Sequence, residues 1–142
     1  MRYLRTGLLI ICCGLFFSTQ AFAQFGYKNV YDTIDGVAVS YKWSHSKWWT
    51  KSSPLQLRFK MKNTNDYPVK ISFELVYMLD HVVKFKSGEQ EKELNPGRTI
   101  SGKLNGFYFE SANLTNKEIK SEEFSWDFMH FDVINTDQEQ IE

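Results

Sequence analysis

Cysteine is almost absent from the sequence, and its two copies, Cys12 and Cys13, both lie near the N-terminus. Residues 1–23 have a basic start, an uncharged apolar run over 7–17 and small residues before Gln24, which is typical of a signal peptide cleaved after Ala23. We therefore expect export to the periplasm or the exterior. The mature chain would contain no cysteine and would hold its fold without disulfides.

Long apolar runs are also missing. The run over residues 7–17 is far shorter than the roughly 20 residues that span a bilayer, so we expect no transmembrane segment in the mature chain. A lipoprotein signal places a small residue before the modified cysteine. Here Ile11 precedes Cys12 and Cys12 precedes Cys13, which argues against a lipid anchor.

The chain has no excess of charge of either sign, because 17 Lys and Arg balance 17 Asp and Glu. Loss of Arg2 and Arg5 with the signal leaves about 119 residues with a formal charge of minus two, which is the size of one ordinary domain. This balance excludes a generally basic nucleic-acid binder, although it leaves room for a local basic patch.

Motifs of the common catalytic sites are absent. The mature chain has no cysteine nucleophile, and the sequence has no G-x-S-x-G elbow, no phosphate-binding glycine loop and no H-E-x-x-H pair. Hydrolysis by scattered acids such as Asp35 and Glu74 would need both in one cleft, which a small sandwich rarely offers. We predict a protein that is not an enzyme and that uses no cofactor.

Metal sites are not expected either. His45, His81 and His130 are isolated in the sequence, so a zinc site would have to gather them in space. The alternating acids over residues 89–93 lack the glycine-bearing loop of calcium sites, and a charged edge strand explains them.

Alternating apolar and polar residues, together with 16% aromatic residues, predict an all-β domain. We expect strands over residues 36–44, 54–63, 69–79, 81–86 and 122–134, with a bulge near Met129-His130, and a weak strand over 88–94. Residues 99–111 form either a hairpin around Asn105-Gly106 or one bent strand with a glycine bulge. The five-residue gap after Asn63 predicts a hairpin between 54–63 and 69–79, and residues 111–121 have room for one helical turn.

Two features of the sequence are candidates for contact with a partner. Gln56, Arg58, Lys60 and Lys62 form a basic stripe, which either meets an acidic partner or pairs with acids on neighbouring strands. Residues 42–54, KWSHSKWWTKSSP, hold three tryptophans. Trp43 is an even number of residues from Val37, so in a strand it would face the core with Val37. Trp48 and Trp49 are adjacent and would face opposite ways in an extended chain, so that one of them could be core.

Trp48 and Trp49, with His45 and Tyr41, are therefore the candidate contact residues. Three interpretations stay open for them: rings that close one end of the core, anchors for a protein partner, or a stacking platform for a sugar.

The segments KMKNTNDYPVKISFELVY and LNPGRTISG resemble small secreted bacterial immunoglobulin-like domains, including the FxLYD-type group. The matching positions are Asn63, Thr64, Asp66 and Pro68 in the first segment and Leu94, Pro96, Gly97 and Thr99 in the second. The match covers roughly residues 54–110 and consists of turn residues, so it implies a fold and no catalytic residue. Domains of this kind act as accessory or interaction modules.

These observations predict one antiparallel immunoglobulin-like β-sandwich of about seven strands over residues 24–135, followed by a flexible tail over 136–142. We expect an exported binding or assembly module that contacts another protein of the envelope or exterior. The alternatives are a carbohydrate-binding module and a structural subunit that exchanges strands with its neighbours.

Overall fold

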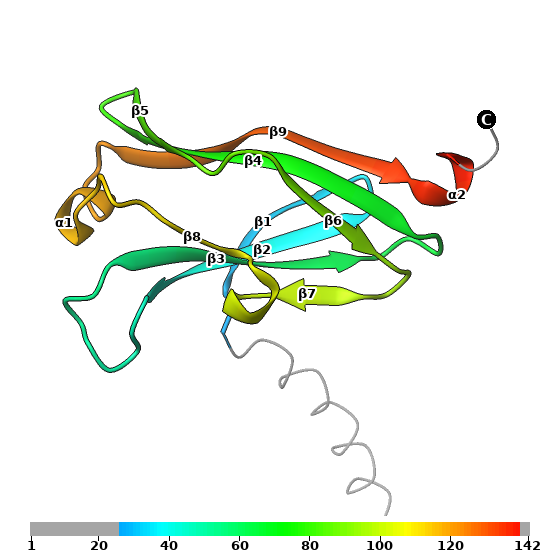
Figure 1. The fold of residues 1–142 in the computed structure, drawn as a ribbon, viewed down its shortest axis with the longest axis horizontal. Coiled ribbons are helices and arrows are strands. Elements are labelled where there is room, and N and C mark those ends of the chain that lie inside the picture. The colour runs from blue at the N-terminus through cyan, green and yellow to red at the C-terminus, as the bar shows by residue number, and fades with distance from the viewer. Residues whose placement is uncertain (1–25, 140–142) are drawn as a thin grey trace, which may run out of the picture.

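The computed structural model describes residues 26–139, which form two antiparallel sheets packed face to face (Figure 1). The expected signal peptide, its expected cleavage site and the last three residues lie outside this range. The nine strands are β1 (Asn29–Ile34), β2 (Val37–His45), β3 (Leu55–Asn63), β4 (Val69–Leu79), β5 (Val82–Lys86), β6 (Gln90–Leu94), β7 (Thr99–Ser101), β8 (Tyr108–Glu110) and β9 (Phe124–Asn135). The helices are the single turns η2 (Lys103–Asn105), α1 (Asn116–Ile119) and α2 (Thr136–Glu139). The expected all-β fold of packed sheets is confirmed.

The nine strands occupy seven lanes, where a lane is one strand position in a sheet. Sheet A has the order β1-β2-β3, with β7 and β8 lying one after the other along the free side of β3. Sheet B has β4 in the middle, β9 on one side, and β5 and β6 in succession on the other. Sheet A therefore has four lanes and sheet B has three.

The break between β7 and β8 settles how residues 99–111 fold. Both strands run in the same direction along β3, and η2 bulges out between them. Phe59 bridges the break, since its N–H donates to the Phe107 carbonyl at 3.1 Å and its carbonyl accepts from the Gly102 N–H at 2.9 Å. The interpretation as a single interrupted strand is thus closer than the hairpin around Asn105-Gly106.

The core follows the predicted period of two. Leu57, Phe59 and Met61 of β3 are fully buried and face Phe73 and Tyr77 of β4 across the sheets. The Tyr77 hydroxyl is satisfied there, because it donates to the Phe109 carbonyl at 2.9 Å. Aromatic rings from β9 and β2 complete the same cluster, which accounts for the high aromatic content without a ligand.

The expected hairpin between β3 and β4 is wrong, because the two strands belong to different sheets. Residues 64–68 carry the chain from sheet A across to sheet B. Asn63 lies at this crossing, has no exposed surface, and donates from its side-chain amide to the carbonyls of Tyr67 and Leu94, both at 2.9 Å. Turn residues fix where a chain reverses, whereas the sheet that receives the next strand depends on burial.

Strand β9 contains the predicted bulge. Its partner residues on β4 step from Glu74, opposite His130, to Leu75, opposite Phe128, so that Met129 has no partner. The insertion lets Phe128 and Phe131 both face the core despite the odd spacing between them.

Strand β1 was not predicted, although the chain carried a signal for it. Asp35 and Gly36, with φ of 44° and 77°, form the two-residue turn that joins β1 to β2. Asp-Gly favours this turn because both positions need positive φ. A bulge between Val30 and Asp32 interrupts the alternation of β1 and hides the strand from a period-two search.

Candidate binding surface at the loop end of the sandwich

The loop over residues 46–54, between β2 and β3, carries the exposed tryptophans. Its base is closed by two bonds, from the Ser46 N–H to the Pro54 carbonyl at 2.8 Å and from His45 Nδ1 to the Ser53 carbonyl at 2.8 Å. Tight turns inside the loop place the Thr50 N–H 3.1 Å from the Lys47 carbonyl. The loop is therefore a closed, internally bonded turn and not a continuation of either strand.

Ser53 organises the inside of this loop. Its side chain is buried at 7% exposure, and Oγ accepts from the Lys47 N–H at 3.1 Å and lies 2.7 Å from the Thr50 carbonyl, to which it donates. Both contacts reach the segment on either side of the tryptophans. A single buried hydroxyl thus holds the backbone that displays Trp48 and Trp49.

Helix α1 ties the loop to the rest of the sandwich. The Asn116 side chain donates to the Ser53 carbonyl at 2.9 Å and accepts from the Leu55 N–H at 2.8 Å. A capping box formed by Thr115 and Glu118 starts α1, and buried Ile119 anchors it. The single helical turn expected within 111–121 is present and supports the loop from the side.

Trp48 and Trp49 both lie outside the core, with 86% and 67% of their surfaces exposed. Their rings meet edge to face, with centroids 5.5 Å apart and planes at 89°. The expectation that one of them could be core assumed an extended strand and is wrong. The chain turns at these positions, so adjacent side chains can project to the same side.

The other candidate residues lie elsewhere. Trp43 faces inward as predicted and packs on Tyr77 at 5.7 Å. Tyr41 also faces inward, against Trp126 at 4.8 Å, and His45 is half-buried at the base of the loop. Only Trp48 and Trp49 come together at the surface, where they form the paired indoles of the loop end, while His45 supports them from beneath.

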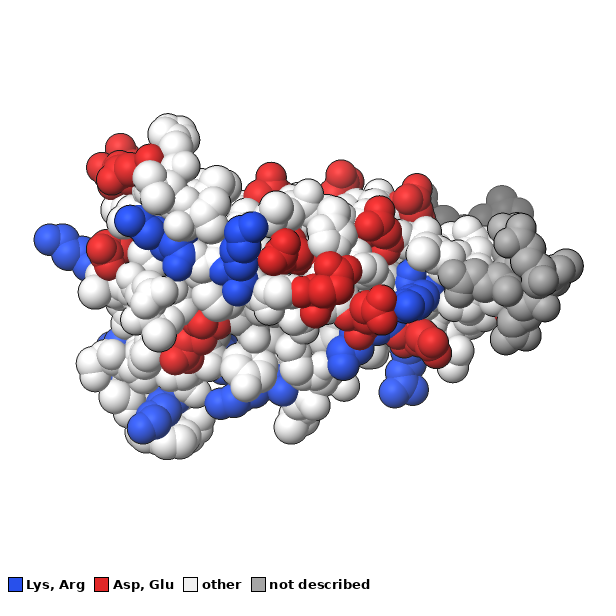
Figure 2. Space-filling model, turned by 45° about the horizontal axis from the view of Figure 1, so that its top comes forward, with Lys and Arg blue, Asp and Glu red and all other residues white. Residues whose placement is uncertain are grey.

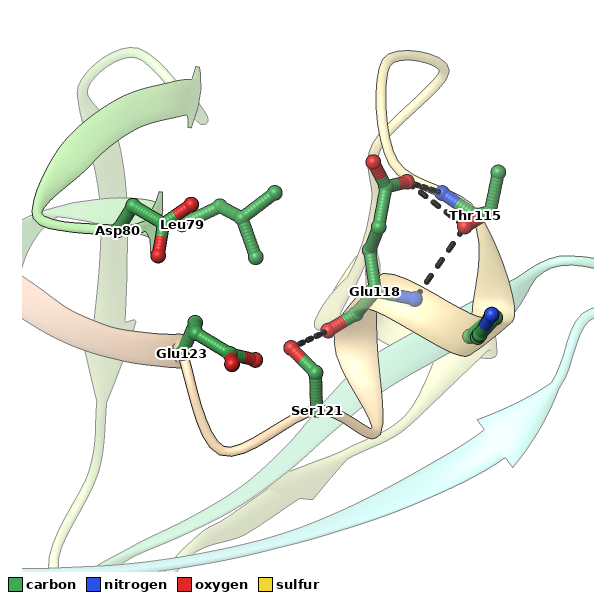
Figure 3. A pocket seen from close by; sticks show the side chains of 7 residues that line it. Leu79, Asp80, Thr115, Glu118, Ser121 and Glu123 are labelled. Atoms are coloured by element: carbon green, nitrogen blue, oxygen red, sulfur yellow. Dashed lines mark hydrogen bonds between the residues drawn. The ribbon is translucent and has the colours of Figure 1, made fainter.

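A pocket opens beside α1 at this same end of the molecule (Figure 3). Leu79 and Asp80 line it from the β4–β5 turn, and Glu123 lines it from the start of β9. Glu118 faces them, but its carboxylate is already bonded to the N–H and Oγ of Thr115, which lowers the pKa of Glu118. Sequence reasoning missed this pocket because its walls come from two segments that are distant in the chain, residues 79–80 and 115–123.

The basic stripe lies along β3 of sheet A, where Gln56 is buried, Arg58 and Lys60 are half-buried, and Lys62 is exposed. The basic residues of the stripe have no acid directly opposite them on β2, since Arg58 lies opposite Lys42 and Lys60 opposite Ser40. The Arg58 guanidinium donates to the His45 carbonyl at 3.2 Å and so braces the loop end from below. At the far edge, Gln56 rather than a basic residue binds Glu110, at 2.7 Å.

The outer face of sheet B is acidic, and Figure 2 shows carboxylates in a band across it. Lys70 pairs with Glu91 at 3.1 Å and His130 with Glu89 at 3.0 Å. The hydrogen bond to Glu89 raises the pKa of His130, while bonds from Ser72 and His130 lower the pKa of Glu89. The expected strand at this acidic edge is present as β6.

Across residues 26–139, no three metal-binding side chains of His, Cys, Asp or Glu lie close enough to hold an ion. In the same range, no helix has the length and apolar character needed to cross a membrane. No protein-family model matches the chain, and no match was found among the curated proteins or the solved structures.

Proposed function

We propose that the chain is an exported, non-enzymatic binding module that contacts another protein of the cell envelope or exterior through the paired indoles of Trp48 and Trp49. The observation that carries the proposal is the display of two adjacent indoles on a loop whose backbone is bonded at its base, its centre and its side.

Folding gains little from these rings in their exposed positions. Covering an indole recovers on the order of 2 kcal/mol or more, and this gain is left for an association step. The Ser53 and Asn116 bonds fix the loop before any partner arrives, which reduces the entropy lost on binding. Exposed Lys47 and Lys51 flank the rings and favour a partner with acids around an apolar pocket.

A protein partner fits this geometry better than a sugar. Stacking of pyranose rings along a platform needs indole faces that lie in one plane, whereas Trp48 and Trp49 stand perpendicular to each other. A perpendicular pair forms a knob that fills a pocket, as hot-spot residues do at protein interfaces. Carbohydrate binding remains the alternative function, through one indole face at a time.

An immunoglobulin-like assignment of the sandwich supports an interaction role. The division of seven lanes into four and three matches the numbers of strands in the two sheets of constant-type immunoglobulin domains, although the order of lanes within each sheet differs. Counted along the chain, β3 is the third lane and pairs with the sixth, β7–β8, while β4 is the fourth lane and pairs with the seventh, β9. Strands B and E, and strands C and F, of immunoglobulin domains are also three positions apart in the chain and pair with each other. Export rests on residues 1–23, and recovery of the processed chain from a periplasmic or culture fraction tests it.

The binding proposal is tested by capture from an envelope extract with three forms of the chain: wild type, Trp48→Ala/Trp49→Ala, and Leu104→Ala. Leu104 is fully exposed on η2 and controls for general surface hydrophobicity. We expect one protein to be retained by wild type and Leu104→Ala and lost with the double variant. Equal capture by all three forms would remove the paired indoles as the contact. Affinity electrophoresis in soluble polysaccharides tests the carbohydrate alternative.

A further inference from the structure

The four outer edges of the two sheets differ greatly in length. Strand β1 has six residues and a bulge, and the lanes of β5–β6 and β7–β8 are each split into two short strands. Short and broken edges are the usual protection against pairing with other chains. Strand β9 has twelve residues, and along the described chain it pairs only with β4.

Two hydrogen bonds fix which peptide groups of β9 point to its open side. The Thr136 N–H donates to the Pro68 carbonyl and the Asp80 N–H donates to the Glu123 carbonyl, both at 3.1 Å. Because bonded and non-bonded pairs alternate in an antiparallel ladder, residues 130, 132 and 134 direct their peptide groups toward β4. Phe131, Val133 and Asn135 direct theirs away from it.

The first half of this edge is already occupied. Asp127 accepts from its neighbour Phe128 N–H at 2.8 Å and from the Tyr31 hydroxyl at 2.6 Å. Tyr31 of β1 also packs edge to face on Phe128, with centroids 5.1 Å apart. The accessible part of the edge therefore runs from Met129 to Asn135.

The side chains of this segment indicate which residues an added strand would need. Phe131 and Val133 face the core yet remain only half-buried, because sheet B has no lane beyond β9 to cover them. Asp132 faces outward between exposed Met129 and Ile134, and Glu74 lies opposite His130 on β4. An added strand would bury apolar side chains on one face and lie beside the Asp132 carboxylate on the other.

We propose that the open edge of β9 from Met129 to Asn135 accepts an extended segment of another protein in which apolar and basic residues alternate. The segment forms a fourth lane of sheet B, with its apolar side chains over Phe131 and Val133 and its basic side chains beside Asp132. Backbone bonds supply affinity, while charge on the outer face selects the segment. This surface shares no residue with the paired indoles, so the two proposals fail independently.

The test is amide hydrogen exchange followed by NMR on the whole mature chain, with the peptide Lys-Val-Lys-Val-Lys-Val-Lys as probe and Glu-Val-Glu-Val-Glu-Val-Glu as control. In the free protein we expect the amides of Phe131 and Val133 to exchange faster than those of His130 and Asp132. The lysine peptide should slow Phe131 and Val133 by about tenfold or more, and the glutamate peptide should not.

Two variants test the charge selection. Asp132→Lys, at an exposed position, should reverse which peptide binds. The glutamate peptide should then protect the amides of Phe131 and Val133, and the lysine peptide should not. Glu93→Lys, on β6 at the far edge of the same face, should keep the wild-type preference. Val133→Pro blocks the edge without removing a bond to β4, and should abolish protection by either peptide.

The proposal is overturned if Phe131 and Val133 are as protected as Asp132 in the free protein, or if both peptides bind equally. It is also overturned if light scattering shows a dimer of wild type that Val133→Pro abolishes, since that would assign the edge to a second copy of this chain.

Discussion

The side-chain amide of Asn63 donates to the carbonyl of Leu94 at 2.9 Å, and this bond joins the end of β3 in sheet A to the end of β6 in sheet B. The same amide group bonds Tyr67, and its oxygen accepts from the Asn65 N–H at 2.9 Å. One buried side chain thus satisfies three main-chain groups where the chain changes sheets.

We predict that Asn63→Ala lowers the free energy of unfolding by about 3 kcal/mol, because it leaves buried carbonyls without a donor. Urea unfolding followed by fluorescence measures the loss. Asn95→Ala, at an exposed position in the β6–β7 turn, is the control and should change stability by no more than about 0.5 kcal/mol. A similar small change in both variants would show that Asn63 does not hold the sheets together.

Substitution of two glycines distinguishes the cost of backbone strain from the cost of steric crowding. Gly36 and Gly88 have φ of 77° and 70°, but a Cβ at Gly36 would lie 2.1 Å from Asn65 Oδ1, whereas one at Gly88 meets nothing within 4 Å. Gly88→Ala should therefore cost about 1–2 kcal/mol from left-handed strain alone. Gly36→Ala should cost at least about 1 kcal/mol more, because Asn65 must move. Equal melting temperatures for the two variants would contradict this difference.

The His130–Glu89 pair predicts a pH-dependent part of stability. The pKa of His130 is raised in the folded state, so its contribution is complete below the ordinary value of 6.5 and is lost as pH rises through the folded value. The pKa of Glu89 is lowered, so its contribution is complete above 4.5 and is lost as pH falls through the folded value.

Wild type should therefore exceed His130→Gln in stability most clearly between about pH 4.5 and 6.5, with the difference shrinking above and below. Unfolding in urea at a series of pH values measures this difference. The matched control repeats the comparison in Glu89→Gln, where the pH dependence should shrink to the smaller effect of Asp132 and Glu74 on His130. A difference that stays constant with pH in both backgrounds would mean that the pair does not couple to folding.

Ser53 offers a way to loosen the paired indoles without removing them. Ser53→Ala breaks the bonds to Lys47 and Thr50, and we expect a loss of about 1–2 kcal/mol together with faster exchange of the Lys47 amide. Partner capture should weaken although both indoles remain. Ser52→Ala, one residue away and exposed, should leave both measurements unchanged. Unaltered exchange in Ser53→Ala would show that the loop is held in another way.

Strand positions were largely predictable, because the alternation in β3 and β4 directly records one buried and one solvated face. The bulge at Met129 was predictable for the same reason, since Phe128 and Phe131 break the parity while both remain apolar. Pairing was not predictable from the turn after Asn63, because its partner Leu94 lies about 30 residues further along the chain.

The candidate surface was only half predictable. Composition pointed to Trp48 and Trp49, but their exposure depends on Ser53 and on Asn116, which comes from a segment more than 60 residues away. Tyr41 was grouped with them by sequence distance, although its parity in β2 matches Trp43 and directs it to the core. The alternation of side chains within a strand therefore predicted the inward orientation of Tyr41 better than its nearness in sequence to Trp48 and Trp49.

The position of β9 has a consequence for the order of assembly. Leu79 of β4 pairs with Phe124 of β9, roughly 45 residues later in the chain, and Val69 pairs with Asn135, roughly 66 residues later. Neither pair can form until β9 has been synthesised. One edge of β4 therefore stays unpaired until nearly all of the domain has been synthesised. Such late closure predicts slow folding, with a risk of aggregation before β9 is available, and slow folding would suit the proposed export of an unfolded chain.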